Sequence, residues 1–106
     1  MLNKQTTLYL YRGTSSSIDF DFSEFNFESG SRCEFSISSI YNDDILLKFT
    51  FNTSKKYTMI ISDEFTSTLN DNKYRYNIMY IVGENRYPQC ADSDIIVKDI
   101  INGTKN

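Results

Sequence analysis

Apolar and polar side chains alternate along most of the chain between Ile18 and Val82. The clearest runs are Ser17–Phe22, which reads Ser-Ile-Asp-Phe-Asp-Phe, and Lys48–Phe51, which reads Lys-Phe-Thr-Phe. Alternation at every second residue places successive side chains on opposite faces of a strand, whereas a helix repeats about every 3.6 residues. The pattern therefore predicts strands that bury one face and expose the other.

Turn-forming residues divide this pattern into about seven or eight strands. The turn signals recur about every ten residues, a spacing typical of an antiparallel β-sandwich. We expect Ile45–Phe51 and Tyr57–Ser62 to form a hairpin closed by Asn52–Lys55. The expected strands are Thr6–Arg12, Ser17–Phe22, Arg32–Ser38, Ile45–Phe51, Tyr57–Ser62, Lys73–Val82 and a last strand. The last strand starts at Arg86 and Tyr87, is interrupted at Pro88 as only an edge or a bulge would allow, and is completed by Asp94–Ile101.

The spacing of apolar residues changes once, after Ser62, from every second residue to the spacing of a helix. Ser62 or Asp63 can accept hydrogen bonds from the free N–H groups of a first helical turn. Phe65 and Leu69 lie four residues apart, so both point to one side of a helix. We therefore expect a short helix or 3₁₀ turn over Asp63–Leu69, with Phe65 and Leu69 filling the core.

One segment allows two interpretations. Ser23–Ser31 is either an extension of the second strand or a loop held over the core by Phe25 and Phe27, and Gly30 ends it in both cases. The run Asn42-Asp43-Asp44 predicts a turn, because short polar side chains can bond to their own backbone.

Length and composition fit a single all-β domain. The chain has 106 residues, with eight tyrosines, eight phenylalanines and one proline. A chain of this size buries about two-thirds of its unfolded surface, so it can form one core without a metal or a disulfide. We expect one domain over residues 1–106, with a short N-terminal arm and a polar C-terminal tail at Asn102–Asn106.

The composition disfavours enzymes, metal sites and nucleic-acid binding. The chain has no histidine, the commonest general base and metal ligand. The acidic groups at Asp19, Asp21 and Glu24, and those at Asn42–Asp44, lack the spacing of a calcium loop. The net charge is −3, with 11 basic and 14 acidic residues spread along the chain. We therefore expect a non-enzymatic protein with no cofactor, no metal and no nucleic-acid partner.

The chain shows no membrane or export signal. No apolar run approaches the roughly 20 residues that span a bilayer, and the N-terminus has no apolar signal core. We expect synthesis in a cytoplasm, which disfavours a disulfide between Cys33 and Cys90. Cys33 alternates with Phe35 and Ile37 and is predicted to be a buried thiol, whereas Cys90 follows Pro88 in a turn-like stretch.

Two segments carry a resemblance to a known family. The first is Arg12-Gly13-Thr14-Ser15-Ser16-Ser17-Ile18. The second runs from Ser62-Asp63-Glu64-Phe65-Thr66-Ser67-Thr68-Leu69, through Asn72-Lys73-Tyr74-Arg75-Tyr76-Asn77-Ile78, to Ile95-Ile96-Val97. In order and spacing they resemble the "R-G-D-T", "S-x-E-x-T-x-x-L" and "G-x-Y-x-Y-x-I" motifs of small immunoglobulin-like domains in phage structural proteins, such as the N-terminal domain of baseplate upper proteins.

The chain also departs from that pattern. Thr14 stands where the family has aspartate, Asn72 stands where it has glycine, and Phe25–Ser31 replaces a "D-L-T-G" corner. The tryptophan and the disulfide spacing of antibody domains are missing as well. The resemblance implies an immunoglobulin-like sandwich and a non-enzymatic component of a virion.

Five apolar side chains are candidates for contact with a partner. Tyr9 and Tyr11 lie on the first strand, which is usually an edge strand, and aromatic residues are enriched at protein interfaces. Ile60, Met79 and Ile81 fall at positions that should be polar if they faced only water. We expect either a partner subunit or the ends of this chain to cover them.

Taken together, the sequence predicts a bacteriophage structural protein located in the virion. We expect it to decorate the capsid, binding other virion proteins through edge strands and terminal arms, and it could also form a homo-oligomer. A tail or baseplate component is an alternative. A second alternative is a carbohydrate-binding or host-surface-binding module in which Tyr9, Tyr11, Tyr41 or Tyr87 stacks on sugars.

Overall fold

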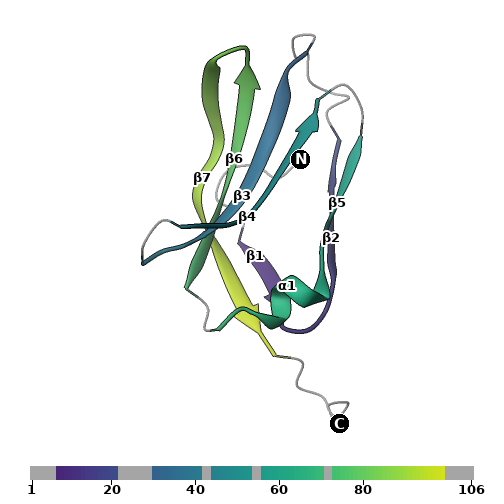
Figure 1. Ribbon diagram of the computed structural model, residues 1–106, viewed down its shortest axis with the longest axis vertical. Helices are drawn as coiled ribbons and strands as arrows, with labels where there is room; N and C mark the ends of the chain where they lie inside the picture. The colour runs from purple at the N-terminus through teal and green to yellow at the C-terminus, as the bar shows by residue number, and fades with distance from the viewer. Residues whose placement is uncertain (1–6, 22–29, 42–43, 54–55, 71–72, 100–106) are drawn as a thin grey trace.

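The computed structural model describes residues 7–21, 30–41, 44–53, 56–70 and 73–99. Two sheets lie face to face, and the short helix lies at one end of them (Figure 1). The larger sheet has the strand order β1-β7-β6-β3-β4 and the smaller has β2-β5. The elements are β1 (Leu8–Tyr11), β2 (Ser16–Phe20), β3 (Arg32–Ser39), β4 (Ile45–Asn52), β5 (Tyr57–Ile61), α1 (Asp63–Ser67), β6 (Tyr74–Val82) and β7 (Asn85–Lys98). The predicted all-β sandwich is confirmed.

Strand pairing is antiparallel except at one edge. β3 pairs with β4 and β6, β6 pairs with β7, and β2 pairs with β5, all antiparallel. The first strand, β1, runs parallel to the last strand, β7, with Tyr9 opposite Ile96. This parallel pair corrects the expectation of a purely antiparallel sandwich. It is possible because nearly the whole chain separates the two strands, and a parallel pair needs a long connection.

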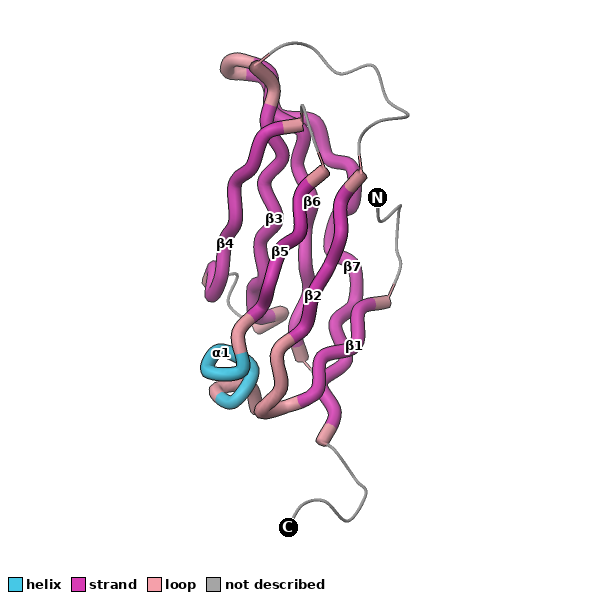
Figure 2. Tube along the Cα trace, turned by 90° about the vertical axis from the view of Figure 1, so that its right-hand side faces the viewer, coloured by secondary structure: helices cyan, strands magenta, loops and turns pink. Residues whose placement is uncertain are grey.

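The expected hairpin between Ile45–Phe51 and Tyr57–Ser62 is wrong. β4 pairs with β3, with Phe51 opposite Cys33, while β5 pairs with β2, with Met59 opposite Ile18. The chain therefore crosses from one sheet to the other between β4 and β5, which Figure 2 shows from the side. Alternation tells which residues face the core, but it does not tell which strand lies alongside.

Aromatic rings fill the space between the two sheets. Phe20 of β2 lies with its ring centroid 4.9 Å from that of Phe51 and 6.4 Å from that of Phe35. Phe51 stacks on Tyr57 of β5 at 4.2 Å, and Phe35 stacks on Tyr76 of β6 at 5.5 Å. These contacts join β2 and β5 to β3 and β4 of the larger sheet, and such ring pairs add to the stability gained from burial alone.

The short helix forms as the sequence predicts. The Ser62 hydroxyl accepts a hydrogen bond from the Phe65 N–H at 3.1 Å, which caps the first turn. Leu69 is buried and Phe65 packs against the core. α1 ends at Ser67, two residues before the predicted end, and the buried Thr66 on its inner side was not singled out by the sequence.

The strand is not broken at Pro88, but the bulge that the sequence required for this proline is present. β7 continues through Pro88, which lies opposite Met79 of β6. The register between β6 and β7 shifts between Tyr76 and Ile78 and again between Ile78 and Met79, so β7 contains extra residues there. A bulge of this kind lets a strand include proline without losing its place in the sheet.

Several predictions fall outside the described residues. They are the second-strand extension or loop over residues 22–29, the first part of the Asn42-Asp43-Asp44 turn, the N-terminal arm and the C-terminal tail. The side chain of Cys90 is also outside them. Cys33 is a fully buried free thiol, as expected, and burial raises its pKa to about 11. A thiol with such a pKa is a poor nucleophile, so its role is packing.

Candidate docking surfaces

The larger sheet has one face in the core and one face turned away from it. On β3, Cys33 and Phe35 are fully buried, so the intervening Glu34 points outward. We call the side of the five-stranded sheet that faces away from β2 and β5 the outer face. The strand registers place four of the five predicted contact residues on the outer face: Tyr9, Tyr11, Met79 and Ile81.

Tyr9 and Tyr11 form an exposed aromatic edge. β1 lies at the edge of the larger sheet, as predicted, and the two side chains are 49% and 42% exposed. The Lys98 ammonium lies 5.6 Å from the centre of the Tyr9 ring, a cation–π distance. This edge therefore offers two large rings and a positive charge to a partner.

Met79 and Ile81 do not offer comparable surface. Ile81 is only 3% exposed and Met79 is partly buried. Ile81 is therefore covered within this chain, which corrects its assignment as an accessible contact residue. The sequence allowed a partner subunit or the ends of this chain as the covering; Ile81 is buried without a partner, and the two ends lie outside the described residues.

Ile60 lies on the other side of the molecule. Its neighbours Met59 and Ile61 are fully buried, so Ile60 points away from the core on β5 and is 58% exposed. β5 belongs to the smaller sheet, which packs on the inner face of the larger one. The five predicted contact residues therefore do not form one surface.

A cluster that the sequence interpretation identified only through Tyr41 lies at the β3–β4 corner. Four large apolar side chains are exposed there, namely Ile40, Tyr41, Ile45 and Leu46. Tyr41 is the most exposed of them, at 74%. One signal was available in the run Ile45-Leu46-Leu47, because three consecutive apolar residues of a strand cannot all face the core.

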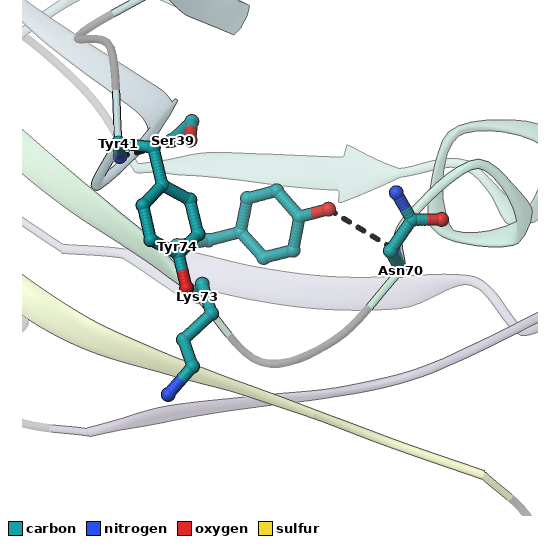
Figure 3. A pocket seen from close by; sticks show the side chains of 5 residues that line it. All are labelled: Ser39, Tyr41, Asn70, Lys73 and Tyr74. Atoms are coloured by element: carbon teal, nitrogen blue, oxygen red, sulfur yellow. Dashed lines mark hydrogen bonds between the residues drawn. The ribbon is translucent and has the colours of Figure 1, made fainter.

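A small pocket of about 240 Å³ adjoins this corner (Figure 3). The Tyr74 hydroxyl accepts a hydrogen bond from the Asn70 N–H at 3.0 Å, and the Tyr41 N–H donates to the Ser39 hydroxyl at 3.1 Å. The pocket is lined by Ser39, Tyr41, Asn70, Lys73 and Tyr74. It combines an exposed ring with amide, hydroxyl and ammonium groups.

Tyr87 lies in a separate hollow near the β6–β7 turn. Its ring centroid is 6.1 Å from that of Tyr80, and the hollow measures about 470 Å³. It is lined by Tyr80, Val82, Asn85, Tyr87 and Gln89. Tyr87 pairs with Tyr80 on the inner face of the sheet, so it shares no surface with Tyr9 and Tyr11.

Two of the motif segments meet in the structure. The Gly13 N–H donates a hydrogen bond to the Thr66 hydroxyl at 3.1 Å, and that hydroxyl donates to the Thr14 carbonyl at 2.8 Å. Gly13 has a φ of +81°, a left-handed conformation that favours glycine. The buried Thr66 of α1 thus fastens the turn between β1 and β2.

Arg12 makes a second connection between the same segments. Its guanidinium group donates to the carbonyl oxygens of Leu69 and Asn70 and forms a 2.7 Å ion pair with Asp99. One side chain therefore ties β1 to the segment after α1 and to the residue that follows β7. These contacts hold the end of β1 in place.

The Arg12–Asp99 pair predicts a pH dependence. The hydrogen bond and positive charge of Arg12 lower the pKa of Asp99 below its usual range. A carboxyl group whose pKa is lower in the folded state stabilises that state above the unfolded pKa of about 4, and this contribution is lost as the pH falls through the folded pKa. Asp99→Asn is expected to melt at a slightly lower temperature than the parent at pH 7, and the difference should shrink as the pH falls below the unfolded pKa of about 4 and through the lower folded pKa.

Thermal melts of four chains would check this result. The parent, Asp99→Asn, Arg12→Gln and the double variant should show that the asparagine substitution matters only when Arg12 is present. An effect of Asp99→Asn that is the same at every pH would contradict the assignment.

Other kinds of site find no support in the described part of the chain. There, no three His, Cys, Asp or Glu side chains gather in a way that could hold a metal ion. No helix among the same residues is long and apolar enough to cross a membrane. Fold and surfaces together define a small β-sandwich with exposed aromatic and aliphatic side chains. The chain matches no protein-family model and no curated protein.

Proposed function

We propose that this chain is a non-enzymatic structural protein of a bacteriophage particle, which decorates the head by docking on other virion proteins. The observation that carries the proposal is the contact between the motif segments, Arg12-Gly13-Thr14 and the turn that contains Thr66 and Leu69. The residues that carry the resemblance to phage structural domains are the ones that fasten this sandwich. Their work is structural, which suits a particle component.

The strand order supports the immunoglobulin-like part of the proposal. In immunoglobulin domains, strands G, F and C lie side by side in one sheet, and variable-type domains add strand C′ beside C. Strands B and E lie in the other sheet. β7-β6-β3-β4 and β2-β5 fit this arrangement. Tyr74, at the start of the penultimate strand, bonds to the Asn70 backbone just upstream, as the tyrosine corner of such domains does.

Particle composition tests this function. Phage particles would be produced from a genome in which the gene for this chain carries a small tag, and heads and tails would be separated on a gradient. The chain is expected in the head fraction in many copies per head. Its presence only in the tail fraction would support the tail or baseplate alternative, and its absence from both fractions would reject the structural role.

A carbohydrate-binding function is the second candidate, and the pocket beside Tyr41 favours it. An exposed ring next to amide, hydroxyl and ammonium groups can stack on a sugar and bond to its hydroxyls. A glycan array would test it with Tyr41→Ala as the loss variant and Leu46→Ala, an exposed residue of the same corner that does not line the pocket, as the control. Selective binding that Tyr41→Ala alone abolishes would reject a purely structural role.

A further inference from the structure

The outer face of the larger sheet carries more cations than acids. Among the described strand residues, the outer face carries five cations and two acids. The whole chain, by contrast, has 11 basic and 14 acidic residues and a net charge of −3. The cations are Arg32, Lys48, Arg75, Arg86 and Lys98, and the acids are Glu34 and Asp94.

Glu34 does not cancel this positive charge. Its side chain is only 15% exposed and lies 2.5 Å from the Arg86 guanidinium and 3.6 Å from the Lys48 ammonium. One carboxylate thus holds two cations in place, and Arg32 follows on the same face of β3. The local charge stays positive, and the cations are preorganised on a rigid sheet, which lowers the entropy lost on binding.

Apolar side chains lie among these cations. Tyr9, Tyr11 and Ile45 are exposed on the outer face, and Lys98 lies over the Tyr9 ring. Ile96 lies beside Tyr9 by register. Tyrosine and arginine are the residue types enriched where proteins meet, while a sheet face that saw only water would carry polar residues at these positions.

The opposite side of the molecule has the opposite character. On the outward side of β2 and β5, Asp19 accepts a hydrogen bond from the Thr58 hydroxyl, and the strand residues described there include no cation. Lys56, directly before β5, lies 3.8 Å from the Asp21 carboxylate, so acids still outnumber cations beside these strands. At the end of β5, α1 begins with Asp63 and Glu64, both exposed. The molecule is therefore electrostatically polarised across its two sheets.

We propose that the outer face of the five-stranded sheet is the docking surface and that its partner is an acidic protein surface. This inference rests on the proposed docking function and adds which face binds and which partner chemistry it fits. Complementary charge steers such an encounter, and the tyrosines supply contact area once it forms. A nucleic acid fits less well, because the chain is acidic overall and Glu34 and Asp94 would face its phosphates.

A titration followed by NMR tests the proposal with a defined probe. The ¹⁵N-labelled chain would be titrated with poly-L-glutamate of about 20 residues at low and physiological salt. Amide shifts are expected at Arg32, Lys48 and Lys98 and not at Thr58 or Ile60, and the affinity should fall as salt rises. Shifts of equal size on both sheets would overturn the proposal.

Charge reversal provides the second measurement. Lys48→Glu with Lys98→Glu should weaken polyglutamate binding at least tenfold, whereas Lys56→Glu, an exposed cation outside the outer face, should change it less than twofold. Thermal melts would verify folding, and Lys48→Gln with Lys98→Gln provides a milder pair if the reversal unfolds the chain. Equal effects of the outer-face pair and the Lys56 control would overturn the proposal.

Other occupants give different results. Tighter binding of a single-stranded DNA of equal length would assign the face to nucleic acid instead. Self-association in sedimentation runs that the Lys48 and Lys98 reversals abolish would assign it to the acidic side of a second copy. If the chain is absent from phage particles but still binds polyglutamate, the proposed function alone is rejected. If the chain still associates with particles after the Lys48 and Lys98 reversals, this inference alone is rejected.

Discussion

Replacing Phe35 with alanine is expected to lower the free energy of unfolding by about 3–5 kcal/mol. The Phe35 side chain is fully buried in the centre of the sandwich. It contacts the ring of Phe20 across the two sheets and stacks on Tyr76 within its own sheet. Truncation removes both contacts and leaves a cavity that the paired strands cannot close. Urea unfolding followed by circular dichroism would measure the loss.

Two variants calibrate this result. Phe35→Leu keeps most of the buried volume and should cost clearly less than the alanine variant. Tyr41→Ala removes a ring of similar size that is 74% exposed, and it should change stability by about 0.5 kcal/mol or less. A loss below about 1 kcal/mol for Phe35→Ala would mean that the ring does not join the two sheets.

Thr66→Val should lower the free energy of unfolding by about 1–3 kcal/mol, the cost of leaving partly buried polar groups without a partner. The substitution keeps the shape of the side chain but removes the hydroxyl that accepts from the Gly13 N–H and donates to the Thr14 carbonyl. The turn between β1 and β2 would lose its link to α1. Chemical denaturation would give the magnitude, and hydrogen exchange at Gly13 would report the local loosening.

The neighbouring threonine is a matched control. The Thr68 hydroxyl is exposed and bonds only to the Phe65 carbonyl within the same turn, so Thr68→Val should cost about 0.5 kcal/mol or less. Thr66→Ser retains a hydroxyl and should recover much of the lost stability. Equal losses for the two valine variants would show that the link between α1 and the β1–β2 turn contributes nothing specific.

Alternation predicted the strands well because burial acts on each residue separately. β3, β4 and β6 begin or end within one residue of the predicted bounds. The residues expected to face inward are fully buried at the centre of the sheet, as Phe35 and Ile78 are, and partly buried toward the strand ends and on β4, as Phe49 is. The short helix was equally predictable, since its cap and its two core positions lie within one turn of each other in sequence.

Strand pairing was not predictable in the same way. Which strands pair depends on contacts between residues far apart in the sequence, as in the pairing of Leu10 with Val97. Short turn signals favoured a hairpin between β4 and β5, but both strands bury their apolar faces by joining different sheets. The two choices satisfy the same alternation, so the hydrophobic pattern alone could not separate them.

The candidate surfaces were predicted in part. Tyr9 and Tyr11 were identified because the first strand has apolar residues on both faces, although the outward face of an edge strand would be polar if it met only water. Both side chains are exposed. Ile81 shows the same pattern and is buried; it lies between Arg32 and Arg86 on a central strand, where neighbouring strands flank it on both sides, whereas β1 is an edge strand. The cationic outer face was invisible in the sequence, since charges spread evenly along a chain can still gather on one side of a folded sheet.

The parallel alignment of the first and last strands has a mechanical consequence. Leu8 lies opposite Ile95 and Tyr11 lies opposite Lys98, so the chain enters β1 at one end of this pair and leaves β7 at the other. A pulling force applied through the two chain ends would act along the strands in opposite directions. It would load all the inter-strand hydrogen bonds of the pair together, as in shear, instead of opening them one by one. The fold should therefore resist stretching between its ends better than an antiparallel closure would.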